Sequence, residues 1–309
     1  MADAQFSKIF VFDINPGTNS ITNELVVGKL AQVLKNICLY QHVVIVAHSN
    51  LSVLIKMVKD AGITNGFIIS DQGARVYHIK SKKLIYDNAI SDDNVQAIIH
   101  FGIMSDALVV LSGTNLEHAY SFNVLNSIDL NKKHYIPLDY SSDYQTFSRF
   151  AKSTNIYSAM VYFKNKDAVV NIAKFFQQIS LDWDFKVHQP LSSFFVITNN
   201  CDSKHNAILK IMEHVNIPSN DNVFYYSLNE IDDYCMRLFK NSFVCHEYAP
   251  QTKFFTKMDS HFKVDALIHD LRERFFVGVI DEKSQANTTA IIDTKKLRTI
   301  MSDSETKKS

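Results

Sequence analysis

The first 80 residues alternate between short apolar runs and segments with helical spacing, and this alternation restricts the fold more than any other feature of the sequence. Residues 8–12, 43–47 and 67–70 are apolar runs of strand length, typical of strands buried on both faces of a parallel sheet. Between them, residues 24–37 and 51–61 carry apolar side chains three and four positions apart, which predicts amphipathic helices. The order strand, helix, strand, helix, strand predicts a doubly wound (Rossmann-like) α/β fold with a parallel sheet.

The middle of the chain follows a different pattern. From about residue 80 to residue 187 aromatic residues are more frequent, and short predicted strands mix with predicted helices. The earlier alternation returns near residue 193, where residues 194–198 predict a strand and residues 206–215 predict a helix. We therefore expect a second domain of α+β type to be inserted into the first.

The predicted domain boundaries follow from these changes of pattern. Residues 1–80 and 188–276 are expected to form the core domain, and residues 81–187 are expected to form the inserted domain. Residues 277–309 are a C-terminal extension, whose polar end, SDSETKKS, is expected to be disordered. A chain of 309 residues is long enough for two domains.

The charge balance and the lengths of the apolar runs exclude two classes of partner. Lys plus Arg and Asp plus Glu number 32 each, so the chain lacks the basic surplus of a general nucleic-acid binder. Its apolar runs are far shorter than the roughly 20 residues that cross a bilayer, and its first ten residues do not resemble a secretory signal. Four cysteines without a CxxC pair favour reduced thiols in a cytoplasmic protein. We expect no nucleic-acid or membrane partner.

Polar residues follow the predicted strands at their carboxyl ends, where doubly wound sheets bind ligands. Asp13 ends the first strand, His48 and Ser49 follow the second, and Lys204 opens a predicted helix. An acidic loop follows the predicted strand at residues 223–226; its members are Asn229, Glu230, Asp232 and Asp233. This grouping favours phosphoryl transfer through an aspartyl-phosphate, in which a carboxylate attacks phosphorus while Mg²⁺ and lysine neutralise charge.

The same segments, in the same order, resemble the four motifs of the haloacid dehalogenase (HAD) superfamily, specifically the Cof-type phosphatases. VFDINPGT resembles the first motif, DxDGT, and VAHSN resembles the second, VATGR. CDSKHNAIL contains the lysine that opens a helix in the third motif, and SLNEID resembles the fourth, GDxxND. The segment IISDQGARVYHIKSKKLIYDNAI is similar to the stretch that leads from the core to the cap. The resemblance covers residues 8 to about 276 and implies that the insertion is a C2-type cap.

The resemblance also implies a role for each matching residue. Asp13 stands at the position of the nucleophile, and Lys204 at that of the catalytic and phosphate-binding lysine. Asp232 matches a metal-binding acid, so the implied Mg²⁺ ligands are Asp13, Asp232 and the backbone carbonyl of Asn15. His48 and Ser49 fall at the phosphate-binding part of the second motif.

Several positions depart from the motifs in ways that weaken the implied chemistry. Asn15 replaces the general acid, and because an amide does not donate a proton near neutral pH, a contribution of typically ~10²–10⁴-fold is lost. Leu228 replaces a metal-binding aspartate. The chain has only 8 glycines, and loops that approach a phosphate closely use glycine where this chain has His48 or Ser49, and Ser227. We expect a retained scaffold with a degraded reaction centre.

Three functions remain open at this point. The first is a catalytically impaired Cof-type protein that binds a small phosphorylated metabolite or a protein partner. The second is a slow Mg²⁺-dependent phosphomonoester hydrolase that acts on sugar phosphates. The third is an interaction protein that uses the surface of the cap. The acids near Asp232 also suit the start of a solvated helix, and His48 also suits a packed side chain. The twelve histidines include no zinc motif.

Overall fold

The computed structural model describes eleven stretches of the chain. They are residues 8–14, 28–47, 49–114, 117–120, 138–141, 143–162, 185–191, 194–227, 233–244, 256–257 and 267–274. The chain divides into two compact units, Met1–Ala266 and Leu267–Ser309. In the second unit, residues 267–274 form a helix that buries Leu267, Ile268 and Leu271. Among the described helices, none has the length and apolar character needed to cross a membrane.

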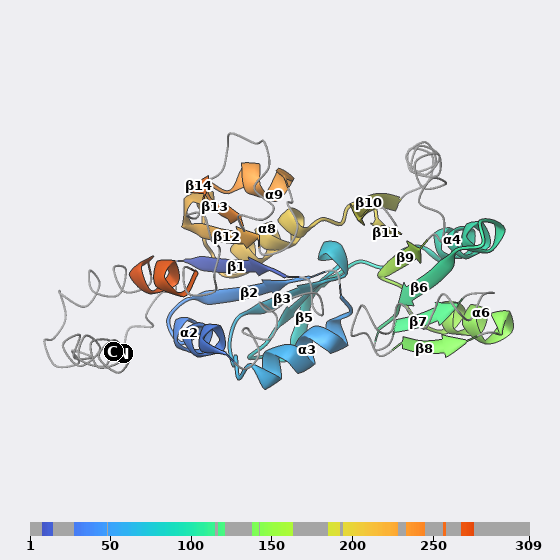
Figure 1. The fold of residues 1–309 in the computed structure, drawn as a ribbon, viewed down its shortest axis with the longest axis horizontal. Helices are drawn as coiled ribbons and strands as arrows, with labels where there is room; N and C mark the ends of the chain where they lie inside the picture. The colour runs from blue at the N-terminus through green and yellow to red at the C-terminus, as the bar shows by residue number, and fades with distance from the viewer. Residues whose placement is uncertain are drawn as a thin grey trace, which may run out of the picture. The chain divides into compact units, whose positions relative to one another are not determined.

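The larger of two sheets in the described part of the first unit has eight strands in the order β14-β13-β12-β1-β2-β3-β4-β5 (Figure 1). Their bounds are β1 Ile9–Asp13, β2 His42–Val46, β3 Phe67–Ser70, β4 Arg75–His78, β5 Lys83–Asp87, β12 Val223–Ser227, β13 Asn241–Val244 and β14 Thr256–Lys257. Neighbours from β14 to β3 are parallel, whereas β3, β4 and β5 form an antiparallel meander. The parallel part is the predicted doubly wound sheet.

Helices cover both faces of this sheet, because its central strands are apolar on both sides. Helices α2 (Lys29–Ile37) and α3 (Leu51–Asp60) lie on one face, and α8 (Lys204–His214) and α9 (Asp233–Leu238) lie on the other (Figure 1). Two short 3₁₀ turns, η1 (Asp71–Gly73) and η2 (Asn220–Asn222), connect elements of the same unit.

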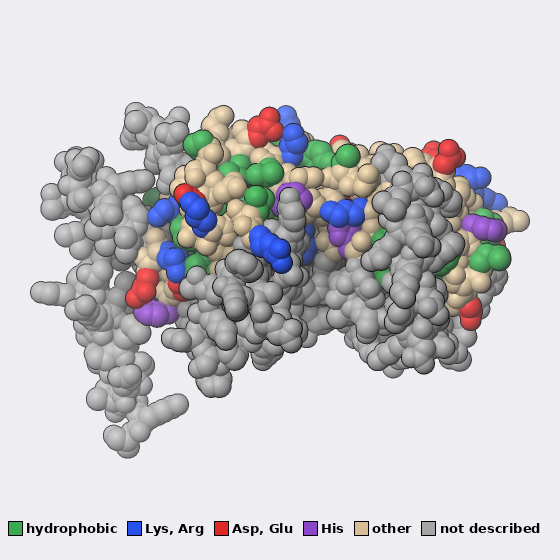
Figure 2. Space-filling view, turned by 90° about the horizontal axis from the view of Figure 1, so that it is seen from above, with side chains coloured by type: hydrophobic (Ala, Val, Ile, Leu, Met, Phe, Trp, Pro, Cys, Tyr) green, Lys and Arg blue, Asp and Glu red, His purple; other side chains and the backbone are tan. Residues whose placement is uncertain are grey.

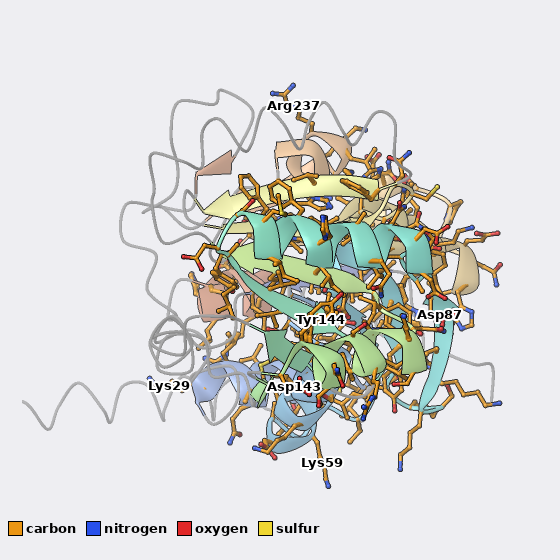
Figure 3. All side chains as sticks on the ribbon, turned by 90° about the vertical axis from the view of Figure 1, so that its right-hand side faces the viewer. Lys29, Lys59, Asp87, Asp143, Tyr144 and Arg237 are labelled. Carbon is orange, nitrogen blue, oxygen red and sulfur yellow. The ribbon has the colours of Figure 1, made fainter. Side chains whose placement is uncertain are left out.

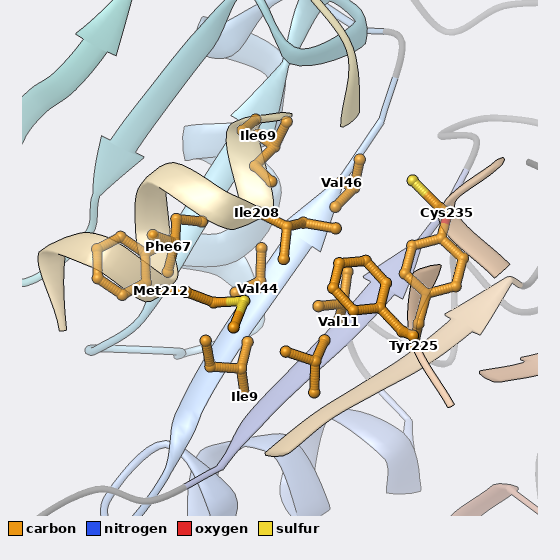
Figure 4. Close-up of a cluster of buried hydrophobic side chains, with 14 of the residues drawn as sticks. Ile9, Val11, Val44, Val46, Phe67, Ile69, Ile208, Met212, Tyr225 and Cys235 are labelled. Carbon is orange, nitrogen blue, oxygen red and sulfur yellow. The ribbon is translucent and has the colours of Figure 1, made fainter. Parts of the chain in front are cut away.

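The core beneath α8 explains how the sheet positions this helix. Side chains of a strand point alternately to its two faces, and Ile9 and Val11 of β1 join the same cluster as Ile208 and Met212 of α8 (Figure 4). Tyr225 of β12 belongs to this cluster as well. The apolar side of α8 therefore lies along the strands, with its first residue toward their carboxyl ends.

A second sheet of the described residues has six strands in the order β10-β11-β9-β6-β7-β8. Their bounds are β6 Leu108–Ser112, β7 Glu117–Tyr120, β8 Leu138–Ser141, β9 Ser158–Tyr162, β10 Phe185–Leu191 and β11 Phe194–Asn199. Helices α4 (Asp92–Met104) and α6 (Tyr144–Ser153) cover one face of this sheet (Figure 3). Their residues Ile99 and Phe147 share a buried cluster with Val109 of β6.

The α/β fold class predicted from the sequence is confirmed, but two strands lie in the sheet other than the expected one. Residues 194–198 were expected in the core sheet, whereas β11 pairs with β10 and β9 in the second sheet. Conversely, β5 lies within the predicted insertion but pairs with β4 in the first sheet. The central residues of β11 are buried, which suits a central strand of either sheet, whereas β5 is a partly exposed strand at the end of its sheet. Neither pattern identifies the sheet, so the sequence does not separate the two cases. The domain boundaries themselves stay a prediction.

Some predicted elements lie outside the described residues. They include the start of the helix predicted at 24–37, one of the helices expected between residues 80 and 187 (residues 166–179), and the extension from residue 277 with its polar end.

Candidate active site

Asp13 is the last residue of β1, a strand in which all five residues are buried. It is aligned with Val46 of β2 on one side and with Ser227 of β12 on the other. Its side chain is only 6% exposed. Because burying a carboxylate without partners is costly, the groups that contact Asp13 determine what this position can do.

Lys204 is the first residue of α8, which begins after the N-cap Ser203. Its Nζ atom lies 2.7 Å from Oδ2 of Asp13, and its side chain is 4% exposed. The two residues are 191 positions apart in the chain. The sequence predicted that they share one crevice, and the structure brings them into a buried ion pair. Their catalytic roles stay predictions.

Tyr225 is a third member of this group, and the sequence analysis missed it. Its hydroxyl donates a hydrogen bond of 2.5 Å to Oδ2 of Asp13, the same oxygen that contacts Lys204. The tyrosine is fully buried, and its ring stacks on Phe239 with the centroids 6.1 Å apart. Strand alternation puts Tyr225 on the same face as Ser227, but the contact with Asp13 also requires β12 to pair with β1 in this register, which no local sequence signal gives.

Ser49 and Asn50 follow β2 at the same edge of the sheet. Ser49 is buried, and its backbone carbonyl accepts a hydrogen bond from the N–H of Asp71 at 3.3 Å. Asn50 caps α3 by accepting from the N–H of Ser52 at 2.9 Å. The side-chain amide of Asn50 also donates to Ser112 Oγ at 2.7 Å, so the second motif contacts the second sheet.

The remaining predicted site residues lie outside the described part of the chain. They are Asn15, His48, Leu228, Asn229, Glu230 and Asp232. Their predicted roles therefore stay predictions.

A buried ionic network joins the two sheets next to this site. Asp71 is fully buried, and its carboxylate accepts from Nε and Nη2 of Arg75 at 2.8 and 2.6 Å. On the second sheet, the hydroxyls of Ser112 and Ser158 donate to Oδ1 of Asp71, the latter at 3.0 Å. Arg75 also donates to the carbonyl of Thr114 at 2.9 Å. The sequence analysis missed this network, since charges four residues apart usually signal a solvated surface.

The turn that carries Asp71 has an unusual backbone. Asp71, Gln72 and Gly73 have φ values of 51°, 58° and 104°, the left-handed region that only glycine enters freely. A Cβ atom on Gly73 would lie 2.3 Å from the carbonyl oxygen of Ser203. This close approach holds η1 against the residue that precedes Lys204.

Asp202 joins the two chain segments that connect the sheets. Its Oδ1 accepts from the hydroxyl of Tyr86 at 3.2 Å and from the amide of Asn88 at 3.1 Å. Its Oδ2 is buried and has no hydrogen-bond partner among the described residues. Burial, with the nearby charge of Asp71, raises the pKa of Asp202 from 3.8 to about 6. Beside it, the amide of Asn199 donates to the carbonyl of Ala89 at 3.0 Å.

Comparison with protein-family models decides the identity. The model of haloacid dehalogenase-like hydrolases matches residues 29–224, more than half of the chain. The chain belongs to this family. The matched range contains Ser49 and Lys204, whereas Asp13 precedes it and the acidic loop at 228–232 follows it.

Solved structures of HAD-like proteins share the fold. A haloacid dehalogenase-like hydrolase of Bacteroides thetaiotaomicron is 11% identical, with a TM-score of 0.68 over 86% of this chain and 99% of its own. A haloacid dehalogenase-like hydrolase of B. subtilis is 13% identical, with a TM-score of 0.67 over 86% and 99%. A sugar phosphatase of HAD subclass IIB is 11% identical, with a TM-score of 0.62 over 90% and 99%. No curated protein matches the chain in sequence.

Phosphotransferases of the HAD superfamily generally use Mg²⁺, and the described residues provide a partial fit to this ion. Asp13 offers a carboxylate oxygen, the kind of ligand that Mg²⁺ prefers. Elsewhere in the described residues, no group of three or more acidic, histidine or cysteine side chains is placed to hold a metal. The other predicted ligands, Asn15 and Asp232, lie outside that part of the chain.

On the face shown in Figure 2, the described acidic and basic side chains are interspersed, without a large patch of one sign.

Proposed function

We propose that this HAD-like protein binds a small phosphorylated metabolite beside Asp13 and Lys204 and hydrolyses it slowly or not at all. The observation that carries the proposal is the buried contact of 2.7 Å between these two side chains at the carboxyl end of β1. We further propose that the second sheet belongs to a cap of the C2 type, which in this family selects the ligand.

The placement of Lys204 supports binding of an anion. An ammonium at the start of an 11-residue helix adds its charge to the positive end of the helix dipole. The described charges of Asp13 and Lys204 cancel, however, so a phosphate dianion adds uncompensated negative charge. We therefore expect binding to strengthen when Mg²⁺ is present.

The chemistry of the leaving group supports slow turnover. Asn15 stands where the resemblance places the general acid, and its amide has no proton to give. Tyr225 does not replace that acid, because its hydroxyl donates to Asp13 itself. In an in-line displacement the leaving oxygen departs on the side of phosphorus opposite the nucleophile, which is the side that Tyr225 does not reach.

Two measurements test this function. Calorimetric titration with a panel of sugar phosphates and nucleoside monophosphates, with and without Mg²⁺, should find a ligand whose affinity falls at least tenfold in Lys204→Met. Lys210→Met is the matched control, because Lys210 lies on the same helix with 54% of its side chain exposed. Phosphate release from the same panel should be negligible. Binding that is unchanged in Lys204→Met, or rapid release, would refute the proposal.

The second candidate is a slow Mg²⁺-dependent phosphomonoesterase. It is favoured by the direct contact between a nucleophile candidate, Asp13, and a charge-neutralising Lys204. This function requires Asp13→Ala to abolish whatever phosphate release the protein shows. Release that survives this substitution would exclude Asp13 as the nucleophile.

A further inference from the structure

Two donors share a single oxygen of the Asp13 carboxylate. Lys204 Nζ lies 2.7 Å and Tyr225 Oη lies 2.5 Å from Oδ2. A carboxylate oxygen has about two acceptor positions, so both positions of Oδ2 are in use. Among the described residues, no hydrogen bond reaches Oδ1.

Oδ2 is also the oxygen that a phosphoryl group should approach. In phosphoryl transfer the lysine neutralises charge on the phosphoryl oxygens, so it must lie next to both the nucleophilic atom and phosphorus. Lys204 contacts Oδ2 and not Oδ1. The hydroxyl of Tyr225 therefore occupies a lone pair of the oxygen best placed for attack.

We infer that Tyr225 caps the nucleophile, and that its hydroxyl suppresses the reaction of Asp13 with phosphorus. The inference rests on the proposed function, since it takes Asp13 to be at the nucleophile position. A hydrogen bond to a charged oxygen is stronger than a neutral one, and it must be broken or displaced before the lone pair reaches phosphorus. This suppression by the Tyr225 hydroxyl adds to the loss of the general acid.

The packing of Tyr225 keeps the hydroxyl in place. The pairing of β1 with β12 aligns Val11 with Tyr225, two residues before Asp13. The ring is fully buried, stacks on Phe239 and shares a cluster with Ile208 of α8 (Figure 4). A rotation that moves the hydroxyl away from Asp13 would disturb these contacts, so the hydroxyl of Tyr225 is a fixed part of the site.

Acetyl phosphate isolates the suppressed step. The lone pair of Asp13 Oδ2 forms a bond to phosphorus, the bond from phosphorus to the acetyl oxygen breaks, and its electron pair leaves with acetate. Acetate departs as an anion and needs no proton. The absence of a general acid at Asn15 therefore does not hide the effect of the Tyr225 hydroxyl on the attack by Asp13.

The experiment compares how fast variants of the full chain are labelled by acetyl phosphate that is radioactive at phosphorus, in the presence of Mg²⁺. Tyr225→Phe removes only the hydroxyl oxygen, and we expect it to label roughly tenfold faster than the unaltered protein, which corresponds to about 1.4 kcal/mol. Tyr226→Phe is the matched control, because Tyr226 is the next residue on β12, is equally buried and points to the other face. Adding Asp13→Asn to Tyr225→Phe should remove the label.

Labelling of Tyr225→Phe that is no faster than that of the unaltered protein overturns the inference, including the case in which neither is labelled. If Tyr225→Phe does not fold, Tyr225→Met removes the hydroxyl and keeps an apolar side chain in its place. A double-mutant cycle gives a second readout: the losses of free energy of unfolding caused by Tyr225→Phe and Asp13→Ala should not be additive, and additive losses overturn the hydrogen bond. Phosphate-ester binding that is unchanged in Lys204→Met counts against the proposed function instead. Failure of the inference about Tyr225 and failure of the proposed function are therefore distinguishable.

Discussion

Removing the charge of Asp71 from its buried ion pair with Arg75 should destabilise the protein far more than removing one member of an exposed ion pair. The side chains of Asp71 and Arg75 are at most 1% exposed, and Asp71→Asn keeps the shape of the side chain while removing its charge. The amide nitrogen of asparagine does not accept hydrogen bonds, so it faces either the donors of Arg75 at the Oδ2 position or hydroxyls such as that of Ser158 at the Oδ1 position. Removing one partner of a buried pair costs about 3–5 kcal/mol, and we expect a loss of free energy of unfolding in this range.

The assay is equilibrium unfolding in urea, followed by circular dichroism. Glu213→Gln serves as the control, because Glu213 pairs with Lys210 while 75% of its side chain is exposed. Exposed pairs contribute ~0–1 kcal/mol, so the control should stay close to the unaltered protein. A loss of less than about 1 kcal/mol in Asp71→Asn would refute the reasoning, because a buried, fully hydrogen-bonded charge has no cheap replacement.

The same substitution has a local consequence that amide hydrogen exchange detects. Asp71 lies in η1, directly after β3 of the first sheet, and Ser112 and Ser158 lie on the second sheet, so the network holds the junction between the sheets. The N–H of Asn88 donates to Ala74 at 2.9 Å, within one of the connecting segments. Exchange at Asn88 should become faster in Asp71→Asn and stay unchanged in the exposed control.

Two further predictions concern the same junction. Because burial raises the pKa of Asp202 to about 6, the folded protein holds this proton more tightly than the unfolded chain. The contribution of Asp202 to the free energy of unfolding should therefore fall as pH rises through 4 to about 6, on the order of 2 kcal/mol. Asp202→Asn should remove this fall. Urea titrations of both proteins at pH 4 and pH 7.5 measure the difference in their free energies of unfolding, and a difference that is the same at both pH values would contradict the prediction. Gly73→Ala places a Cβ atom 2.3 Å from the backbone of Ser203, whereas Gly62→Ala, also at positive φ, meets only the flexible end of a lysine side chain. Both should be less stable by roughly 1 kcal/mol or more, but only Gly73→Ala should weaken phosphate-ester binding, as calorimetry can measure.

The part of the fold that the sequence predicts well is the part in which local pattern and topology coincide. The runs at 8–12 and 43–47 are too apolar for a sheet with a solvated face, so a doubly wound sheet follows directly. The contact between Asp13 and Lys204 was predicted from strand ends that meet at one edge of a parallel sheet, but this premise was wrong for Lys204, because the strand that precedes it, β11, pairs in the second sheet.

What the sequence does not determine is the register and pairing of strands. Tyr225 reaches Asp13 because β12 lies beside β1 with Val11 opposite Tyr225, and neither fact is local. Asp71 and Arg75 look like surface charges until Ser112 and Ser158 from the second sheet supply their partners. These contacts depend on which sheet borders which turn, so they are visible only in three dimensions.

The hydrogen bond between Asn199 and Ala89 has a consequence for how this chain can change over evolutionary time. It holds the two ends of the segment between Ala89 and Asn199 next to each other, so the length of that segment does not affect the geometry of the first sheet. The entropic cost of closing a loop grows only with the logarithm of its length. Large insertions, deletions or wholesale exchange of the intervening part should therefore be tolerated by the sheet, provided that its two ends still meet at this bond.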